Sequence, residues 1–362
     1  MIGVYIHIPF CRTRCPYCDF VSRPISGAVP EPFTDALWTE IGAFSGANDV
    51  ETVFLGGGTP SLLHPNAVKR ILSAVQTRFR LREPEITLEA NPDDVTPALA
   101  DAWRARGINR VSLGVQSFDD ATLRYLGRRH DASTARRACA CVAERFENWG
   151  LDLIFGAYPV DAWDATLKTC VGFAPKHVSA YGLTYESKAP FGSRAKEAVD
   201  DATWLRLYQQ AEDVLAASGY EHYEISNYAR QGFACRHNLI YWRNEEYAGF
   251  GPGAYSFIDG VRAQNPSDFE TYLQRPGDKV EALRLSPREI RVETVIQRLR
   301  LKSGLDKADY RLRFGNDVRA DFGQAMDLLI ARGLLEEDAT AIRPTLQGFV
   351  WHNEMGLALV ED

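Results

Sequence analysis

Residues 4–18 read VYIHIPFCRTRCPYC, a run of β-branched and aromatic residues followed directly by three closely spaced cysteines. The run at residues 4–8 has the composition of a β-strand. Cys11, Cys15 and Cys18 therefore fall in the loop that follows the first predicted strand. In parallel α/β proteins, loops at the carboxyl ends of strands carry the ligand site.

Similar strand-like runs recur from residue 1 to about residue 220, each followed by a longer stretch of helical period. The predicted strands are residues 4–8, 52–55, 85–89, 110–115, 151–155 and 178–183. Helices are predicted at residues 31–44, 65–78, 133–145 and 202–218, and they are long enough to connect parallel strands. The alternation predicts an α/β fold in which residues 1–220 form a partial (β/α)6 barrel.

A smaller second domain is predicted over residues 221–362. Its first part, residues 223–257, is aromatic and rich in Gly and Pro, and residues 287–300 and 317–332 then have helical period. Gly333 ends the last of these helices, and residues 340–350 predict a short hairpin. The order of elements is typical of an α+β, winged-helix-like domain.

Composition limits the classes of partner. The 362 residues carry a formal net charge of −7 with the two signs interspersed, so no basic stripe is present to bind a nucleic acid. No apolar run is long enough to span a bilayer, and no secretory leader is evident, so we expect no membrane insertion. Seven cysteines are an odd number, which favours reduced thiols and a cytoplasmic location over a disulfide scaffold.

The three clustered cysteines point to a metal centre. Thiolates hold iron–sulfur clusters, and three thiolates on a four-iron cubane leave one iron open. Two alternatives are half of a zinc site and cysteines that are merely buried in the core. A closed zinc site needs four ligands, and the other close pair, Cys139 and Cys141, is spaced i, i+2 on a predicted helix, which turns the two side chains apart.

Polar or glycine-rich motifs follow the next predicted strands. Gly56, Gly57 and Gly58 would let the backbone approach a ligand, although a tight strand-to-helix turn is the plainer explanation. Glu89, Gln116 and Asp152 fall at or near strand ends, where buried polar groups need partners. Arg128 suits a carboxylate, or else forms a surface ion pair.

The C-x3-C-x2-C spacing after the first strand resembles the radical S-adenosylmethionine (SAM) superfamily. That resemblance implies that Cys11, Cys15 and Cys18 hold a [4Fe-4S] cluster whose open iron binds SAM. Reduction of the cluster would then cleave SAM, the cofactor supplying the radical chemistry.

Within the superfamily, the chain resembles the coproporphyrinogen-dehydrogenase-like family. The shared motifs are Y-I-H-I-P-F-C, G-G-G-T-P-S-L-L, E-A-N-P, N-R-V-S-L-G-V-Q-S-F, L-G-R-R-H, D-L-I-F-G and H-V-S-A-Y-G-L-T. The family's SAM contacts match Tyr5, Tyr17, Gly57, Gly58, Thr59, Glu89, Gln116, Arg128 and Asp152.

The segment H-N-L-I-Y-W from His237 resembles the haem-chaperone branch of that family. The resemblance implies haem as a third cofactor, His237 as a candidate haem ligand, an acceptor protein for haem and an electron donor such as flavodoxin or ferredoxin. True dehydrogenases carry an N-terminal extension and a further cysteine two positions after the triad, where this chain has Phe20. The chain departs from the family pattern at residues 157–161, at residues 187–189 and at Tyr255.

Two classes of function therefore stay open. The first is a haem-binding protein that passes haem to an acceptor and cleaves SAM at most as an auxiliary step. The second is an enzyme, either an oxygen-independent coproporphyrinogen III oxidase or a related radical SAM methyltransferase. The cluster and SAM motifs are common to both, and no residue is assigned a catalytic role. A protein that uses its cluster only structurally is a third reading, which the glycine motif and Glu89 disfavour.

Overall fold

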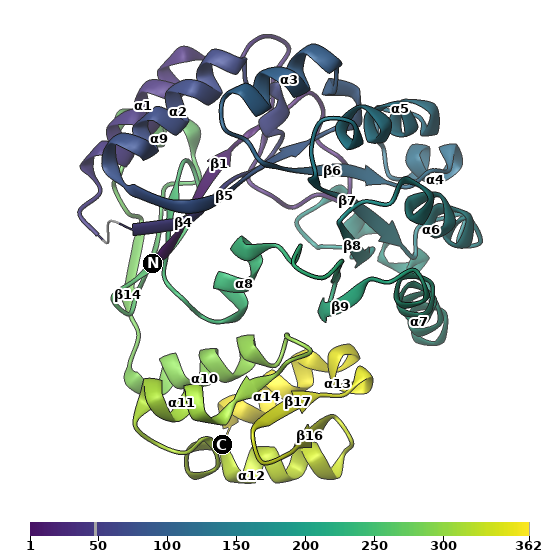
Figure 1. Cartoon of the computed structure of the whole chain (residues 1–362), viewed down its shortest axis with the longest axis vertical. Helices are drawn as coiled ribbons and strands as arrows, with labels where there is room; N and C mark the ends of the chain where they lie inside the picture. The colour runs from purple at the N-terminus through teal and green to yellow at the C-terminus, as the bar shows by residue number, and fades with distance from the viewer. Residues whose placement is uncertain (47–48, 362) are drawn as a thin grey trace.

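The structure is a computed structural model that describes residues 1–46 and 49–361. Asp362, the last residue of the expected second domain, lies outside this range. A curved sheet with helices on its outer face forms the larger part of the molecule, and a small helical unit packs below it (Figure 1). In the described ranges, every helix is too short or too polar to cross a bilayer.

Six parallel strands form the centre of the sheet, which confirms the predicted partial barrel. They are β1 (Ile2–Ile8), β4 (Asp49–Gly57), β5 (Arg80–Ala90), β6 (Arg110–Gln116), β7 (Asn148–Phe155) and β8 (His177–Gly182). The connecting helices are α1 (Glu31–Ala43), α2 (Pro65–Arg78), α3 (Pro97–Ala105), α4 (Asp120–Tyr125), α5 (Ala132–Ala143), α6 (Ala162–Phe173) and α7 (Asp201–Ala217). Three 3-10 segments lie in the loops: single turns at Pro60–Leu62 and Pro92–Asp94, and a longer segment at Pro190–Glu197.

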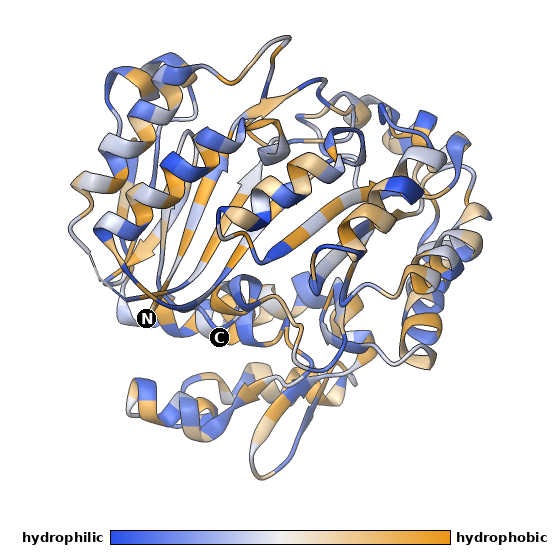
Figure 2. Ribbon diagram, turned by 45° about the horizontal axis from the view of Figure 1, so that its top comes forward, coloured by the Kyte–Doolittle hydropathy of each residue, from blue (hydrophilic) through white to orange (hydrophobic). Residues whose placement is uncertain are grey.

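Alternation along the strands separates the core from the barrel interior. On β6, Val111, Leu113 and Val115 are fully buried apolar residues, whereas the polar or small residues between them point to the inside of the curve. The strands of the large sheet are mainly hydrophobic, and the helices carry hydrophilic stretches (Figure 2). The outer face of the sheet therefore forms the main core with the helices, and the inner face is free to build a site.

The sheet is wider than the sequence predicted. In the described residues it has twelve strands in the order β14-β13-β12-β11-β1-β4-β5-β6-β7-β8-β10-β9. The added strands are β9 (Glu221–Glu224), β10 (Asn227–Ala229), β11 (Tyr247–Phe250), β12 (Tyr255–Ile258), β13 (Val261–Gln264) and β14 (Glu281–Arg284). Strand β11 pairs with β1 in parallel, so chain beyond residue 220 completes the edge of the barrel.

The short helix α8 (Arg236–Trp242) lies inside the curve of the sheet (Figure 1) and contacts β1 and β4. It closes the floor of the barrel. Helix α9 (Phe269–Gln274) packs outside against α1, and the short strands β2 (Phe10–Cys11) and β3 (Arg23–Pro24) pair next to the cysteine loop.

The C-terminal unit has its own apolar core, formed by residues between Val292 and Leu359. Its elements are α10 (Pro287–Arg298), β15 (Leu305–Asp306), α11 (Lys307–Phe314), α12 (Val318–Ala331), β16 (Leu335–Glu337), β17 (Ala341–Pro344), α13 (Leu346–Val350) and α14 (His352–Glu361). A three-stranded sheet formed by β15, which follows α10, and by the hairpin β16–β17, which follows α12, gives the winged-helix-like pattern that was expected. The hairpin lies earlier than the predicted residues 340–350, because residues 346–350 form α13. Because strands β9–β14 belong to the barrel sheet, we propose that the unit begins near residue 285 rather than at residue 221.

The start of this unit is fixed locally by α10. Ser286 Oγ accepts a hydrogen bond from the Glu289 N–H at 3.2 Å, and Glu289 accepts one from the Ser286 N–H at 2.6 Å. Pro287 occupies the first helical position, where its missing N–H costs nothing.

Candidate functional site

A cavity of about 460 Å³ opens at the carboxyl ends of the parallel strands and extends into the barrel. Alternate residues of three neighbouring strands line it: Arg110, Ser112, Gly114 and Gln116 on β6, Asp152 and Ile154 on β7, and His177, Ser179 and Tyr181 on β8. The cysteine loop forms part of its mouth. This is the place at which the sequence predicted a site.

Cys11, Cys15 and Cys18 are free, half-buried and all on the cavity wall. Thr59 Oγ1 lies 3.5 Å from Cys11 Sγ, and Arg128 Nη1 lies 3.5 Å from Cys15 Sγ. Burial is the main cause that raises the pKa of Cys11 and of Cys18, and the neighbouring thiols of the triad raise both pKa values further. The three sulfur atoms are therefore close enough to repel one another as thiolates, a repulsion that a cationic centre between them would remove.

The donor set fits a cluster better than a single ion. Within the described parts of the chain, no three His, Cys, Asp or Glu side chains are placed to bind one metal ion together. A cubane takes each thiolate on a different iron, so its ligands do not converge on one point. Cys139 and Cys170 are buried in the core, Cys141 lies on the outer helix α5, and Cys235 lies at the barrel floor, so within the described residues no fourth cysteine joins the triad to complete a zinc site.

The glycine motif at the end of β4 is required by close backbone contacts. A Cβ on Gly58 would lie 2.6 Å from the carbonyl oxygen of Phe10, next to Cys11. Gly57 has a φ of +109°, in the region that favours glycine. The motif therefore holds the cysteine loop and the end of β4 against each other, and Gly57 and Gly58 expose backbone to the cavity.

Arg128 is fixed on one wall by several acceptors. Its Nη2 donates to Asn91 Oδ1 at 2.6 Å and to the Gly114 carbonyl at 2.7 Å, and its Nη1 lies 3.4 Å from the Tyr17 hydroxyl. Gln116, at the end of β6, has a φ of +66°, which a non-glycine residue adopts only at a cost. Such backbone strain is common at ligand sites, and here it aims the amide at the cavity.

Two carboxyl groups face the cavity: Glu89 on β5 and Asp152 on β7, the two strands that flank β6. Removal from water, together with the nearby Asp152, raises the pKa of Glu89 to about 8, while the hydrogen bond from the Gly57 N–H opposes the shift. Burial also raises the pKa of Asp152, against hydrogen bonds from Ser179 and Ser112, the latter at 3.2 Å. At neutral pH the pair can hold a proton, and Glu89 can both donate and accept hydrogen bonds.

The structure brings most of the predicted residues together. The cavity is lined by Cys11, Cys15, Tyr17, Cys18, Gly57, Gly58, Thr59, Glu89, Gln116, Arg128 and Asp152. Tyr5 and His237 are not part of this lining. The Tyr5 hydroxyl lies 3.1 Å from His7 Nδ1, and the Tyr5 ring stacks near Phe54.

His237 lies behind the cavity on α8, with 1% of its surface exposed. Its Nδ1 is 2.7 Å from Thr52 Oγ1, its Nε2 is 2.9 Å from the Tyr241 hydroxyl, and its ring stacks on Phe54. Burial lowers the pKa of His237 to about 3, so the imidazole is neutral. A neutral ring suits a metal, but both nitrogens are engaged in this conformation.

Several cavity residues were not predicted: Arg110, Ser112, His177, Ser179 and Asn238. Four of them lie within predicted strands or at a strand start. The alternation of side chains along a strand could have identified them. Arg110, Ser112, Gly114 and Gln116 are every second residue of one strand, so they share a face with Gln116, which was a predicted site residue. Asn238 was part of the H-N-L-I-Y-W segment but was not singled out.

Comparison with known proteins shows which family the chain resembles. The Radical SAM superfamily model matches residues 5–168, and the HemN C-terminal domain model matches residues 285–351. Heme chaperone HemW of Synechocystis sp. is 39% identical, with 84% of this chain and 79% of that protein aligned. Heme chaperone HemW of Escherichia coli is 34% identical, over 98% of this chain and 97% of that protein.

Among solved structures, coproporphyrinogen III oxidase (HemN) from Escherichia coli superimposes with a TM-score of 0.85, covering 99% of this chain and 89% of that chain at 22% identity. That likeness shows a shared fold and nothing about activity. The identities to the curated relatives extend over almost the whole chain. The chain therefore belongs to the HemW family of radical SAM proteins.

Proposed function

We propose that this protein carries a [4Fe-4S] cluster on Cys11, Cys15 and Cys18, binds SAM beside it, binds haem and delivers the haem to an acceptor protein. One observation supports the site most strongly: the three thiols, the glycine motif and Arg128 all open on one cavity. The haem part of the proposal rests on the relatives, which are named heme chaperones.

Residues of the chain would orient SAM in the upper cavity. Gly57 and Gly58 offer backbone close to the triad, and Glu89 presents a buried carboxyl group whose pKa is raised to about 8. Arg128 is held in place by Asn91 and Gly114, so its charge stays fixed beside the cysteine loop. The proposal also takes Tyr5, Tyr17, Thr59, Gln116 and Asp152 as SAM contacts. When bound and reduced, the cluster would supply the electron that cleaves SAM.

For haem, His237 is proposed as a ligand of the iron, and it would first have to change its hydrogen-bond partner. Its Nε2 would have to release the Tyr241 hydroxyl, at 2.9 Å, before it could reach an iron. The hydrogen bond from Nδ1 to Thr52 could remain and orient the ring, as such partners do for metal-bound histidines.

Partners and location complete the proposal. We propose a cytoplasmic protein that takes electrons from a donor such as flavodoxin or ferredoxin. The exposed residues Arg12 and Arg14 lie between the triad cysteines, so a donor could reach the loop from solvent. Coproporphyrinogen dehydrogenase activity is not expected.

The test is anaerobic reconstitution with iron and sulfide, followed by titration of haem into the wild type and His237→Ala. The Soret band and SAM cleavage are followed in parallel. His352→Ala is a matched control, since His352 is also buried and bonded through Nε2 to a carbonyl, in the C-terminal unit. Stoichiometric haem that depends on His237, with little SAM turnover, supports the proposal. If His237→Ala binds haem as the wild type does, His237 is not the haem ligand. If the protein converts coproporphyrinogen to protoporphyrinogen, it is an enzyme rather than a haem chaperone.

A further inference from the structure

Arg110 is a buried cation without a carboxylate partner. It is the first residue of β6, has 1% of its surface exposed and lines the deep end of the cavity. Its Nη1 donates to Asn148 Oδ1 at 2.9 Å and approaches the Phe233 carbonyl at 3.4 Å, while its Nε has no acceptor. Among the described residues no acid lies within ion-pair distance of it. Burying a guanidinium in this way is costly unless something neutralises it.

The acids nearest to Arg110 are already engaged elsewhere. Glu85 Oε1 accepts hydrogen bonds from the backbone N–H of Arg236 at 2.9 Å and of His237 at 3.4 Å, at the start of α8. Asp152 is bonded to Ser112 and Ser179. Both carboxylates act on Arg110 only at a distance, and they help to raise its pKa against the effect of burial. What the protein does not supply is a direct acceptor for all of the guanidinium donors, since hydrogen bonds to the described residues are made by Nη1 alone.

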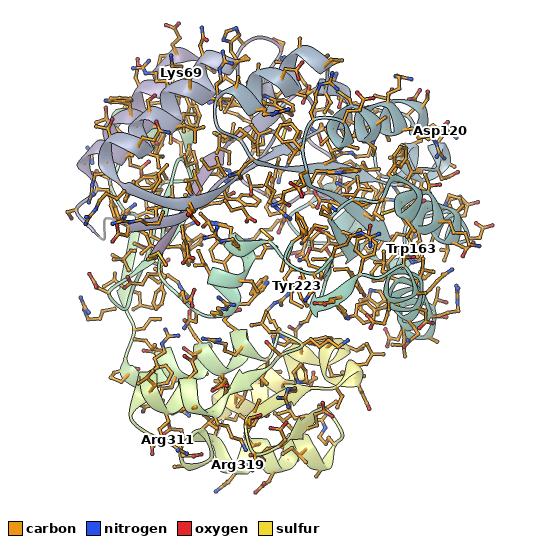
Figure 3. The ribbon with its side chains drawn as sticks, in the orientation of Figure 1. Lys69, Asp120, Trp163, Tyr223, Arg311 and Arg319 are labelled. Carbon is orange, nitrogen blue, oxygen red and sulfur yellow. The ribbon has the colours of Figure 1, made fainter. Side chains whose placement is uncertain are left out.

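Two further polar groups at this depth lack partners. His177 Nε2 lies 2.9 Å from the hydroxyl of Tyr223, whereas His177 Nδ1 is buried without a hydrogen bond. Arg110 is close enough to help burial lower the pKa of His177 well below its usual value, which keeps the ring neutral. Tyr223 is seen beside α8, where the barrel meets the C-terminal unit (Figure 3). When its hydroxyl donates to Nε2, the ring proton of His177 sits on Nδ1, which packs over Gly150 and has no hydrogen-bond partner, so the ring would have to turn before Nδ1 could donate to a ligand.

Asn238 supplies the third group. It lies on α8, lines the cavity, and its side-chain amide has no hydrogen bond to any described residue. Its backbone N–H is directed at the sulfur of Cys235, which lies within electrostatic range of Arg110. An amide and a guanidinium at one end of a cavity, with small residues Ser112 and Gly114 leaving space above them, form a concave anion site.

We infer that Arg110, His177 and Asn238 form a carboxylate-binding subsite at the floor of the barrel, below the position proposed for SAM. The inference rests on the proposed function in one respect: a propionate group of haem is one source of this carboxylate. The other source is a small free carboxylic acid, which would make the subsite the specificity pocket for a separate substrate.

The experiment uses three ligands with the reconstituted full-length protein: haem, haem dimethyl ester and sodium propionate. Affinity is measured for the first two, and the rise in Tm for the third, with sodium chloride at equal ionic strength as reference. The variants are Arg110→Gln and Asn238→Ala. Arg145→Gln is the matched control, because Arg145 is also shielded but pairs with acids on the outer helices.

If haem is the source, the wild type binds haem at least about tenfold tighter than its dimethyl ester, and the difference disappears in Arg110→Gln and shrinks in Asn238→Ala. If a free acid is the source, propionate raises the Tm of the wild type and of Arg145→Gln but of neither subsite variant, whatever the haem affinity. Equal affinity for haem and its ester, with no effect of propionate on Tm, overturns the subsite. Absence of all haem binding with a propionate effect refutes the proposed haem function and leaves the subsite standing. Should Arg110→Gln not fold, Asn238→Ala decides alone.

Discussion

The backbone N–H of Gly57 donates a hydrogen bond to Oε2 of Glu89 across 3.1 Å, linking the ends of β4 and β5 at the edge where the cavity opens. Through this bond the glycine motif and the carboxyl group act as one unit. The carboxyl group is oriented by the backbone that also supports the cysteine loop. A substitution at Gly57 should therefore shift the Glu89 carboxyl group, and a substitution at Glu89 should shift the backbone at Gly57.

Replacing Gly58 by alanine should disrupt the cysteine loop while leaving the barrel folded. The new Cβ would lie 2.6 Å from the Phe10 carbonyl and 2.9 Å from the Ile8 carbonyl, so the backbone beside Cys11 must move. We expect iron content after reconstitution to fall below half of the wild-type value. Gly107→Ala is the control, since that glycine has open space around it but a φ of +95°. Full iron content in Gly58→Ala would show that the loop does not depend on this contact.

Glu89→Gln should remove a pH dependence of stability. Glu89 has a pKa of about 8 in the folded protein against an ordinary 4.5, so the folded state binds the extra proton between these values. Ionisation therefore destabilises the fold as pH rises from about 4.5 to 8, by at most about 1.4 kcal/mol per pH unit. Below this window both states are protonated and the effect vanishes.

The measurement is urea unfolding of the protein without cofactors at several pH values, comparing the wild type with Glu89→Gln. The glutamine variant should gain stability relative to the wild type as pH rises through the window. Glu354→Gln, a change at an exposed position on α14, should show no such trend. Parallel curves for Glu89→Gln and the wild type would mean that the carboxyl group ionises normally.

Much of the fold follows from patterns that act locally. The six parallel strands were predicted because β-branched runs alternate with helical segments. Both patterns can be recognised from a short stretch of sequence, without knowing its tertiary neighbours. Strand β11 was missed because its residues, YAGF, are few and include glycine, and because its partner β1 is more than 200 positions away. Only the completed barrel makes that segment a strand, so a sequence-based boundary at residue 221 could not take the pairing of β11 with β1 into account.

The site likewise has features that local sequence predicts and features that depend on the tertiary structure. The sequence identified the cysteine triad and the strand-end residues, since their position follows from where a strand ends. It also identified the segment on α8, but not that Asn238 rather than His237 lines the cavity. Neighbouring residues on a helix point about 100° apart. His237 turns to Thr52 and Phe54 behind the wall, and Asn238 turns into the cavity.

Tyr241→Phe should change haem binding if His237 is the ligand. The hydroxyl of Tyr241 occupies Nε2 of His237 at 2.9 Å, and a haem iron must displace it. Removing a hydrogen bond worth about 1 kcal/mol should tighten haem binding about fivefold. Tyr247→Phe is the control, because that ring packs edge-on against Tyr241 at 4.6 Å and does not bond to His237. Haem binding is measured by Soret titration. Weaker binding in Tyr241→Phe would instead mean that the hydroxyl of Tyr241 contributes to haem binding rather than competing with it.

Arg300→Gln should weaken the contact between the barrel and the C-terminal unit in a pH-dependent way. Arg300 Nη2 lies 3.5 Å from Oε2 of Glu224, a fully buried carboxylate, and its guanidinium stacks 4.1 Å from the centroid of Trp242. Burial raises the pKa of Glu224, and Arg300 is the main influence that lowers it. Without Arg300 the carboxylate must stay charged and unpaired or take up a proton, which costs about 3 kcal/mol of stability at pH 8.

Lower pH should relieve most of this loss. At pH 5 protonation of Glu224 is easier, so the variant should approach the wild type, and Glu224→Gln in the Arg300→Gln background should remove the pH dependence. Arg332→Gln, at an exposed position after α12, is the matched control and should change unfolding by less than about 0.5 kcal/mol. A deficit in Arg300→Gln that is equal at pH 5 and pH 8 would assign the role of Arg300 to its stacking on Trp242 rather than to its charge.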